Sequence, residues 1–421
     1  MKKNIKVNNN GLAAINTAPI WILLLIALWL CEDFFGLFHQ SPTIRFPIYS
    51  LLFVICYKKT TAFSKPLLLL FISMWLSIFS CKIYHNQSFI QSFSGYATFG
   101  AIAIYFVLLK IHFPIYKLEK IIFGMFLVFC GCYLYQMAVF PKPVFIGADN
   151  PYSEQLDMIL RRIRMPGMSL VGLGLFYSLN KALLGKVQYF AFVILAVVML
   201  LLFGFRTLIA IAAIFSFVMV VKINGFSWKL LIGLALVLGI IYGISLTSFG
   251  QETFEGMMER QEDDQNFGNK DYIRYTTLFY YTQSHFKDAI EFFLGSGIAN
   301  RQNNPAYGQY YMRLESYGIH YYDWGILGMS WMMGMLSLIA MIWYPIKAFL
   351  AKLPKEKVFL SVWFGYLLSC GFTSAEFVRQ GCFLVQGMVL YEIYVITLQN
   401  EQNNNSQQRR LTSTSRKRWS R

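Results

Sequence analysis

The chain has 421 residues, of which 56% are hydrophobic and 14% are charged, and its mean hydropathy is +0.47. This composition excludes an ordinary soluble domain, because a soluble core could not cover so much apolar surface. The formal net charge of +16 comes mainly from loops between apolar segments. It therefore does not point to nucleic acid as a partner, although an anionic membrane leaflet would attract the basic end of the chain.

Apolar runs near 20 residues recur along the chain and are long enough to cross about 30 Å of hydrocarbon. They predict an all-α integral membrane protein of about 12 transmembrane helices with a large helical loop between the ninth and tenth. The predicted spans are 18–38, 43–57, 66–81, 92–110, 120–140, 166–180, 187–204, 206–221, 229–247, 324–346, 358–374 and 381–398.

Loops rich in lysine and arginine alternate along the chain with loops that contain few of them. This bias sets the orientation of membrane helices. With the N-terminus inside, the inner loops and the C-terminal tail carry most of the basic residues. The short outer loops carry only Arg45, Lys82, Arg206 and Arg379. Both termini are therefore expected in the cytoplasm.

This topology divides the chain into four parts. Nine spans lie in 1–247, which includes a smaller outer loop at 141–165. A large outer loop occupies 248–323, and three further spans lie in 324–398. The tail 399–421 is polar, basic and of low complexity, and is expected to be disordered.

The seven cysteines lie in or beside the spans, so neither a disulfide framework nor a zinc site is expected. The first apolar run is long and is followed by further spans, so we expect it to be retained rather than cleaved as a signal peptide. No Gly-rich nucleotide loop is present. The sequence predicts no cofactor and no metal.

The smaller outer loop ends in Arg161-Arg162-Ile163-Arg164 and then Met165-Pro166-Gly167. In the residues before this cluster, apolar and charged side chains are spaced as on the two faces of an amphipathic helix at the membrane interface. The arginines would then either lie on a solvated face and grip lipid headgroups, or form a phosphate clamp. Arg161 and Arg164 are candidates for the clamp, because guanidinium groups bind phosphate in a bidentate manner.

Arg206 lies between the seventh and eighth spans, in the run Gly204-Phe205-Arg206-Thr207. A charge at this position is costly unless it faces a wet or protein-lined cavity, which makes it a functional candidate. The alternative is that its side chain extends to the nearby interface.

The large outer loop begins with an acidic segment, Glu252–Asp271, which is expected to be a solvated surface. The segment Asp271–Phe293 is predicted to form one amphipathic helix, with Arg274, Tyr281 and His285 near one face. The turn Gly295-Ser296-Gly297 should end this helix. Arg301 follows the turn.

Tyrosines then crowd the stretch up to the tenth span, where Tyr317 and Tyr321 lie beside polar groups. Such rings suit either stacking on sugar rings or an aromatic belt at the membrane surface. The loop closes with Glu315, His320 and Asp323. A histidine between two acids at the mouth of a membrane cavity indicates acid–base chemistry.

The order of these motifs resembles the superfamily of Wzy-type O-antigen polymerases and O-antigen ligases. The matching elements are Arg164-Met-Pro-Gly167, Phe205-Arg206-Thr207, Arg274 before Phe293-Leu-Gly295-Ser-Gly297-Ile298, and Glu315 and His320 before Gly325-Ile-Leu-Gly328. The resemblance covers roughly 150–330 by motif and the rest by topology. Many ligases have His-Asn in the closing motif, whereas this chain has His320-Tyr321, which favours a polymerase.

The resemblance implies a multi-pass protein of the bacterial inner membrane whose active site faces the periplasm. Its substrates would be undecaprenyl-pyrophosphate-linked glycans, and it would transfer the growing glycan to a new lipid-linked repeat unit with inversion and without metal. Arg164, Arg206 and Arg274, with Arg161 and Arg301, would bind the pyrophosphate. His320 or Glu315 would be the base, and Tyr317, Tyr321 and Asp323 would contact sugar. Membrane lipids are implied partners, and a chain-length regulator is left open.

Two other functions remain open at this stage. An O-antigen ligase would transfer the finished glycan to lipid A core. A flippase or transporter for lipid-linked sugars would place charges or broken helices at the middle of the bilayer. The notable charges of this chain lie near the outer interface instead, which favours an enzyme.

Overall fold

The structure is a computed structural model that describes residues 42–140, 142–145, 163, 165–225, 273–301, 305–372 and 374–418. Several predicted features lie outside this part of the chain. They are the spans 18–38 and 229–247, the interfacial helix ending in Arg161 and Arg164, and the acidic segment Glu252–Asp271.

Every regular element within the described residues is helical, as the apolar runs predicted. The α-helices are α3 (Pro42–Cys56), α4 (Ser64–His85), α5 (Phe89–Gly100), α6 (Ile104–Ile111), α7 (Ile115–Ala138), α8 (Ser169–Leu183), α9 (Phe190–Phe203), α10 (Arg206–Asn224), α13 (Ile273–Gln283), α14 (Ala289–Leu294), α15 (Pro305–Ser316), α16 (Gly325–Met333), α17 (Met335–Phe349), α18 (Val358–Gly371) and α19 (Cys382–Arg418). The 3-10 turns are η2 (Ala101–Ala103), η4 (Val187–Tyr189), η6 (Tyr321–Trp324), η7 (Lys355–Lys357) and η8 (Ala375–Val378).

Five helical segments of the described chain are long and apolar enough to cross a membrane: Ser64–His85, Phe89–Ile111, Ile115–Ala138, Arg206–Asn224 and Cys382–Asn404. Shorter apolar helices cover Thr43–Cys56, Val187–Phe203 and Met335–Phe349. The described part of the protein is therefore all-helical, with several helices suited to a bilayer.

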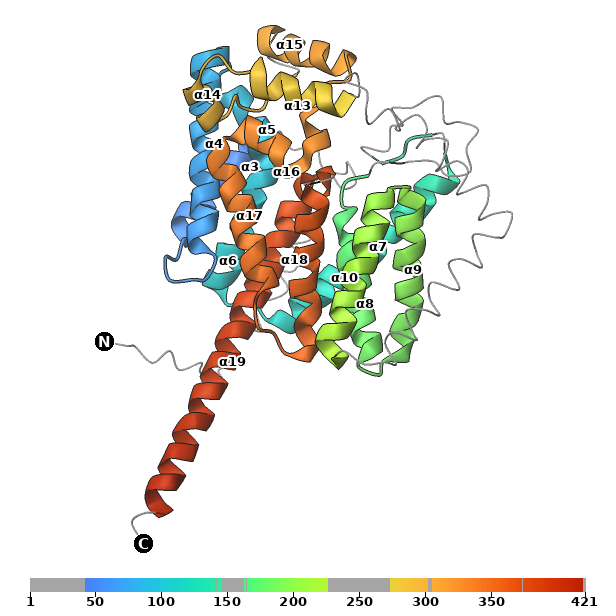
Figure 1. The fold of residues 1–421 in the computed structure, drawn as a ribbon, viewed down its shortest axis with the longest axis vertical. Coiled ribbons are helices and arrows are strands. Elements are labelled where there is room, and N and C mark those ends of the chain that lie inside the picture. The colour runs from blue at the N-terminus through green and yellow to red at the C-terminus, as the bar shows by residue number, and fades with distance from the viewer. Residues whose placement is uncertain are drawn as a thin grey trace.

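The helices form one bundle, in which α18 and the first half of α19 lie between two groups (Figure 1). One group holds α3 to α6 together with α16 and α17, and the other holds α7 to α10. Helix α18 packs on α17 from the first group and on α8 and α10 from the second. Fully buried Trp363 and Tyr366 of α18 fill this junction.

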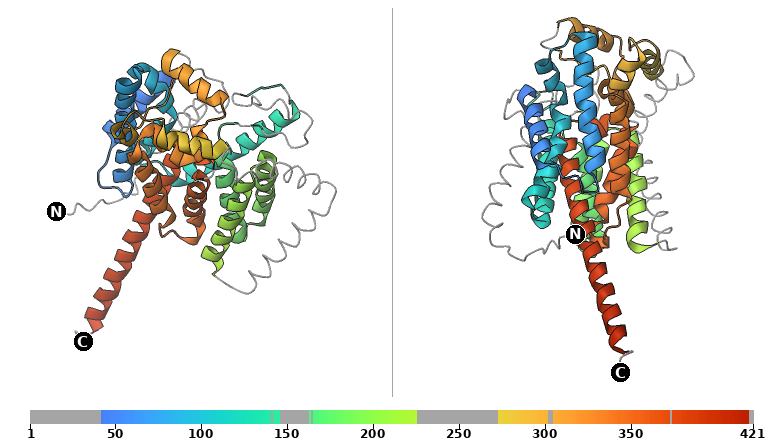
Figure 2. Two further views of the ribbon diagram at one scale, coloured as in Figure 1. Left: turned by 45° about the horizontal axis from the view of Figure 1, so that its top comes forward. Right: turned by 90° about the vertical axis from the view of Figure 1, so that its left-hand side faces the viewer.

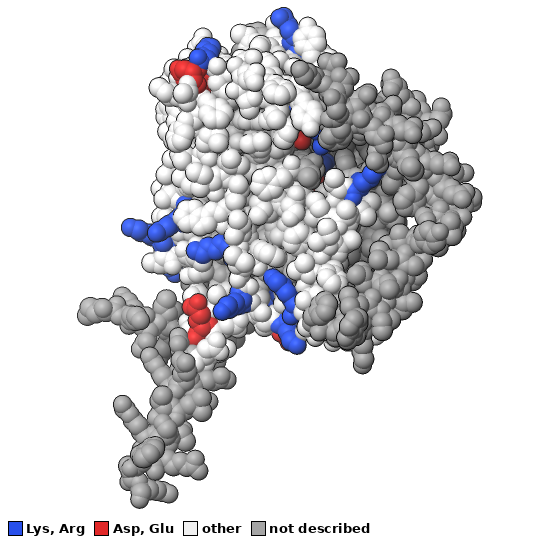
Figure 3. All heavy atoms as spheres, viewed as in Figure 1, with Lys and Arg blue, Asp and Glu red and all other residues white. Residues whose placement is uncertain are grey.

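The two ends of the bundle differ in their coverage and in their charge. Helices α13, α14 and α15 lie across one end, here called the capped end (Figures 1 and 2). Basic side chains gather around the opposite end, near the point where α19 leaves the bundle (Figure 3). Contacts join the residues of this lysine end: Lys357 pairs with Glu119, and Lys222 donates to the Phe349 carbonyl at 3.4 Å.

Basic residues also occur at the capped end. Lys287 donates to the Tyr84 carbonyl, and Lys82 lies in the last turn of α4. Arg274 belongs to α13, Arg313 to α15, and Arg301 to the loop before α15.

The predicted tenth span, 324–346, is not one helix. It is broken at Gly334, whose φ of +86° excludes an ordinary side-chain-bearing residue. The break leaves the carbonyls of Trp331 and Met332 without helical partners, and they accept hydrogen bonds from the backbone of Ser296 (3.1 Å) and Gly297 (2.9 Å). The loop after α14 thus inserts into the break and satisfies its backbone groups.

Two further predictions need correction. The single helix expected over Asp271–Phe293 is divided into α13 and α14, because Asp288 caps a new helix by accepting from the Glu291 backbone at 2.8 Å. Its predicted end is correct, since α14 stops at Leu294 before Gly295. The tail expected to be disordered continues α19 as far as Arg418, because 399–418 contains no glycine or proline to end the helix.

Candidate functional site

The closing motif of the large loop lies at the capped end, where η6 packs on α13 and η8 and the start of α16 lies against the end of α18. Gly325 makes this contact possible. A Cβ atom there would lie 2.0 Å from the Gly371 carbonyl oxygen and 2.6 Å from that of Ser374, and the residue has φ +50°. Glycine at this position therefore allows two backbones to touch, and it brings His320 and Asp323 close to η8.

Arg274 lies on the exposed side of α13, near its start. Its backbone carbonyl accepts a hydrogen bond of 3.1 Å from the indole Nε1 of Trp324. This bond fastens the first turn of α13 to η6. Two predicted site residues, Arg274 and Asp323, are thereby brought into one region although they are far apart in the sequence.

Arg301 and Glu315 form an ion pair, through Arg301 Nη2 and Glu315 Oε1. The Arg301 side chain is 49% exposed and that of Glu315 is 18% exposed. The sequence predicted a phosphate-binding role for Arg301 and a possible basic role for Glu315. Their pairing means that each partly neutralises the other.

His320 is half-buried and extended just before η6, and its carbonyl accepts a 3.2 Å hydrogen bond from the Asp323 backbone. The two tyrosines predicted to contact sugar differ. Tyr317 is 67% exposed, whereas Tyr321 is only 3% exposed and packs edge-on against Tyr311. Tyr321 is therefore part of the packed interior, and its burial contradicts the predicted sugar contact.

Arg206 is the first residue of α10 and is half-buried. Helix α9 ends in the left-handed turn of Gly204 (φ +66°), which allows the chain to reverse immediately before the arginine. The Tyr133 hydroxyl lies 3.5 Å from the Leu202 carbonyl. The same hydroxyl lies next to the backbone of Ile163 and within electrostatic range of Arg379. The α9–α10 turn is therefore a neighbour of η8.

Glu376 in η8 is a buried carboxylate that the sequence analysis did not select. Its Oε2 atom accepts a 3.1 Å hydrogen bond from Arg379 Nε, and the two side chains are 1% and 17% exposed. Burial raises the pKa of the Glu376 carboxyl, and the Arg379 guanidinium offsets part of this rise. An acid followed three residues later by an arginine, within an apolar stretch, was the available sequence signal.

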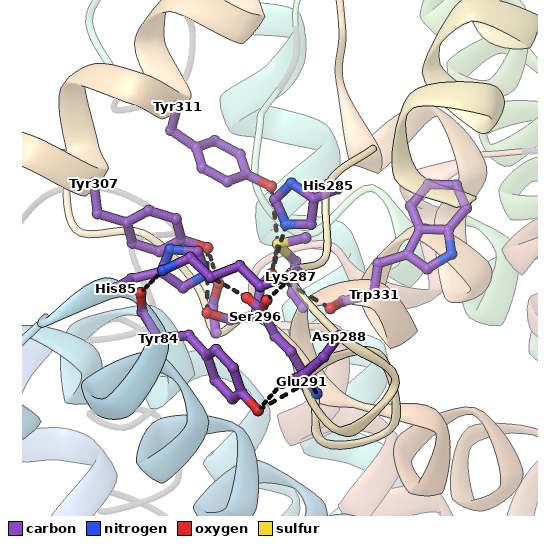
Figure 4. A network of polar contacts seen from close by, with 12 residues as sticks. Tyr84, His85, His285, Lys287, Asp288, Glu291, Ser296, Tyr307, Tyr311 and Trp331 are labelled. Carbon is purple, nitrogen blue, oxygen red and sulfur yellow. Dashed lines mark hydrogen bonds and ion pairs between the residues drawn. The ribbon is translucent and has the colours of Figure 1, made fainter. Parts of the chain in front are cut away.

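A polar network fastens the loop after α13 to the end of α4 (Figure 4). The carboxylate of Glu291 is fully buried. It accepts hydrogen bonds from His85 Nε2 at 2.5 Å and from the Lys287 backbone at 2.7 Å. Burial alone would raise the pKa of the Glu291 carboxyl, but these bonds outweigh it and hold the pKa below its usual value.

The second half of the network surrounds His285, which is 6% exposed. Its Nε2 atom lies 2.9 Å from Ser296 Oγ, and Tyr307 donates to the Ser296 carbonyl at 3.2 Å (Figure 4). Burial, with a smaller contribution from His85, lowers the pKa of His285 to about 3. His285 is therefore neutral at physiological pH and serves to hold the loop.

The sequence analysis assigned His285 only to a helix face and did not select His85, Glu291 or Ser296. The pattern Asp288-Ala-Ile-Glu291 is a typical helix start and could have revealed the break before α14. The partnership between α4 and this loop had no sequence signal, because the two histidines are about 200 residues apart in the chain.

The structure thus brings several predicted residues to one end of the bundle. Trp324 joins η6 to Arg274, Arg301 pairs with Glu315, and His320 directly precedes η6. Arg206 lies in the neighbouring α9–α10 turn, and Figure 3 shows charged side chains of both signs on this side of the molecule. Arg161 and Arg164 lie outside the described residues. Within the described part of the chain, no cluster of His, Cys, Asp or Glu is arranged to hold a metal ion. No protein-family model, curated protein or solved structure matches the chain.

Proposed function

We propose that the protein is a Wzy-type polymerase of undecaprenyl-pyrophosphate-linked oligosaccharide repeat units, with its site at the capped end. The observation that carries this proposal is that Arg274 and Arg301, which come from different segments of the large loop, meet around η6, next to His320. Trp324 of η6 donates to the Arg274 carbonyl, and Arg301 pairs with Glu315 and lies within electrostatic range of Tyr322 in η6. The bias of basic residues toward the cytoplasm does not account for arginines at this end.

A pyrophosphate ligand accounts for arginines at the outer end. The guanidinium group is planar, permanently charged and suited to bidentate contact with phosphate. Arg206 and Arg274 come from different elements and meet the same end of the bundle, so they can stabilise the charge that develops on a leaving pyrophosphate. Arg161 and Arg164 belong to the same proposal through their sequence alone.

This assignment places twelve spans in the inner membrane of a bacterium, with both termini in the cytoplasm and the capped end in the periplasm. The lysine end is then the cytoplasmic end. A site at the membrane interface suits a reaction at the pyrophosphate headgroup of a lipid whose glycan extends into the periplasm.

The reaction is a direct displacement at an anomeric carbon. The oxygen of an acceptor sugar hydroxyl forms the new glycosidic bond, and the bond between the anomeric carbon and the pyrophosphate oxygen breaks with inversion. The hydroxyl proton passes to a base. His320 suits this role better than Glu315, because the Glu315 carboxylate is already engaged in an ion pair with Arg301.

Purified protein in nanodiscs, supplied with lipid-linked repeat units from cells that lack it, tests the proposal. Ladders of products indicate a polymerase. Transfer only to core lipid indicates the ligase alternative, and movement across the bilayer without a new bond indicates a transporter. Either of the last two results overturns the proposal.

Two matched comparisons test the residues. Arg206→Lys should abolish ladders by removing the bidentate fork, whereas Arg313→Lys on the exposed side of α15 should leave them unchanged. His320→Gln should be more damaging than Glu315→Gln. The reverse order would make Glu315 the base.

A further inference from the structure

We propose that Arg379, held in place by the buried carboxylate of Glu376, is an additional binding residue for the lipid-linked pyrophosphate. This inference rests on the proposed function for the identity of the ligand. Neither residue belongs to the motifs that carry the family resemblance.

The backbone of η8 is fixed on three sides. Ser374 caps its first turn by accepting from the Glu376 backbone at 3.4 Å. Gln386 of α19 donates to the Phe377 carbonyl at 3.0 Å, and its own oxygen accepts from the Tyr344 hydroxyl. Because Phe377 is fully buried, the segment that carries the ion pair cannot easily shift.

The ion pair occupies only part of the guanidinium. Glu376 accepts from Nε, and no hydrogen bond joins the two terminal nitrogens of Arg379 to another described residue, while the side chain is 17% exposed. The Glu376 carboxylate, which is 1% exposed, needs a partner charge to be buried, and Arg379 supplies it. Holding Nε restricts the plane of the guanidinium and leaves its terminal nitrogens for a ligand, which is the arrangement that a preorganised phosphate site requires.

The surroundings of Arg379 relate it to another candidate arginine. Arg379 lies within electrostatic range of Tyr133, whose hydroxyl reaches Leu202 just before the α9–α10 turn. Arg206 begins α10 directly after that turn. The segments that carry the two arginines thus share Tyr133 as a neighbour, and a pyrophosphate carries two phosphate groups to be bound.

The test measures binding rather than turnover. Farnesyl pyrophosphate serves as a short probe, with farnesyl monophosphate and farnesol as comparators, in phosphatidylcholine nanodiscs. Loss of a charge-assisted hydrogen-bonding group should weaken pyrophosphate binding by roughly 10- to 100-fold in Arg379→Lys and Arg379→Gln. Glu376→Gln should weaken it to a lesser extent, and farnesol binding should not change. Arg313→Gln on α15 is the matched control.

A purely structural ion pair predicts a different result: lower thermal stability with an unchanged ratio of pyrophosphate to farnesol affinity. That outcome overturns the inference, as does a wild-type protein that does not bind the probe. Arg379→Lys keeps the charge and guards against loss of folding. Phosphatidylglycerol in the nanodiscs could instead compete with the probe for wild type but not for Arg379→Lys. That result would identify a lipid headgroup as the ligand of Arg379 and overturn the inference.

Failure of the proposed function can be separated from failure of the inference. A wild-type protein that binds farnesyl pyrophosphate through Arg379 but makes no ladders supports the anion site and overturns only the polymerase reaction. Ladders from wild type, together with unaltered binding in both Arg379 variants, overturn the inference alone.

Discussion

Replacing Glu291 with glutamine should release the loop after α13 from the end of α4. The carboxylate is fully buried and accepts from His85 Nε2 at 2.5 Å and from the Lys287 backbone at 2.7 Å. Glutamine has the same shape, but one oxygen becomes an amide donor that faces another donor. The loss of one charge-assisted hydrogen bond should cost about 1.5–3 kcal/mol.

This free energy corresponds to roughly a 10- to 150-fold increase in the local opening equilibrium, because about 1.4 kcal/mol is a factor of ten. Hydrogen–deuterium exchange of peptides from 284–301, in nanodiscs, measures that increase directly. Asp288→Asn is the matched control, since it also converts a carboxylate to an amide but is exposed and keeps a good helix cap. Exchange in Glu291→Gln that equals that of wild type would refute the reasoning, and an equal increase in both variants would show only general sensitivity.

Three further predictions concern pH, backbone strain and orientation. The pKa of His285 is about 3 in the folded state, below its value near 6.5 in the unfolded state. Its contribution to the free energy of unfolding should therefore be constant above pH 6.5 and should fall by about 1.4 kcal/mol for each pH unit below that. Thermal unfolding of His285→Gln at several pH values should lack this part of the pH dependence. Gly334→Ala should lower the melting temperature, because the added Cβ would lie 2.5 Å from the Leu294 carbonyl oxygen and the residue has φ +86°. The control Gly124→Ala, whose Cβ meets nothing within 4 Å, should be neutral or slightly stabilising. Met312→Cys on α15 should react with an impermeant maleimide from the periplasm, and Lys352→Cys should not; the opposite pattern would reverse the orientation.

The apolar runs of the sequence correctly predicted the helical character of the described part of the chain. Local chemistry also located the end of α14 at Gly295. These features depend on residues within one turn of the boundary, so they can be read from a short window. The polar tail was misjudged because its composition suggested disorder, whereas its lack of glycine and proline permits the helix to continue.

Contacts between distant segments decided the rest. The sequence of 324–346 favours one unbroken helix at every position except Gly334. The break there is stabilised by the backbone of Ser296 and Gly297, which belong to another loop. Tyr321 resembled an exposed sugar-binding ring until packing against Tyr311 buried it. The pairing of Arg301 with Glu315 likewise changed the chemistry expected of each.

Thus the sequence by itself determined the helical character of the described chain, the uneven distribution of basic residues among its loops and most of the candidate residues, because hydrophobicity, charge and turn chemistry are local properties. Only the tertiary structure decided which buried groups pair, as His85 with Glu291 and Arg379 with Glu376. The physical reason is that a buried charge must find its partner in space, and the packing of the bundle chooses that partner from anywhere in the chain.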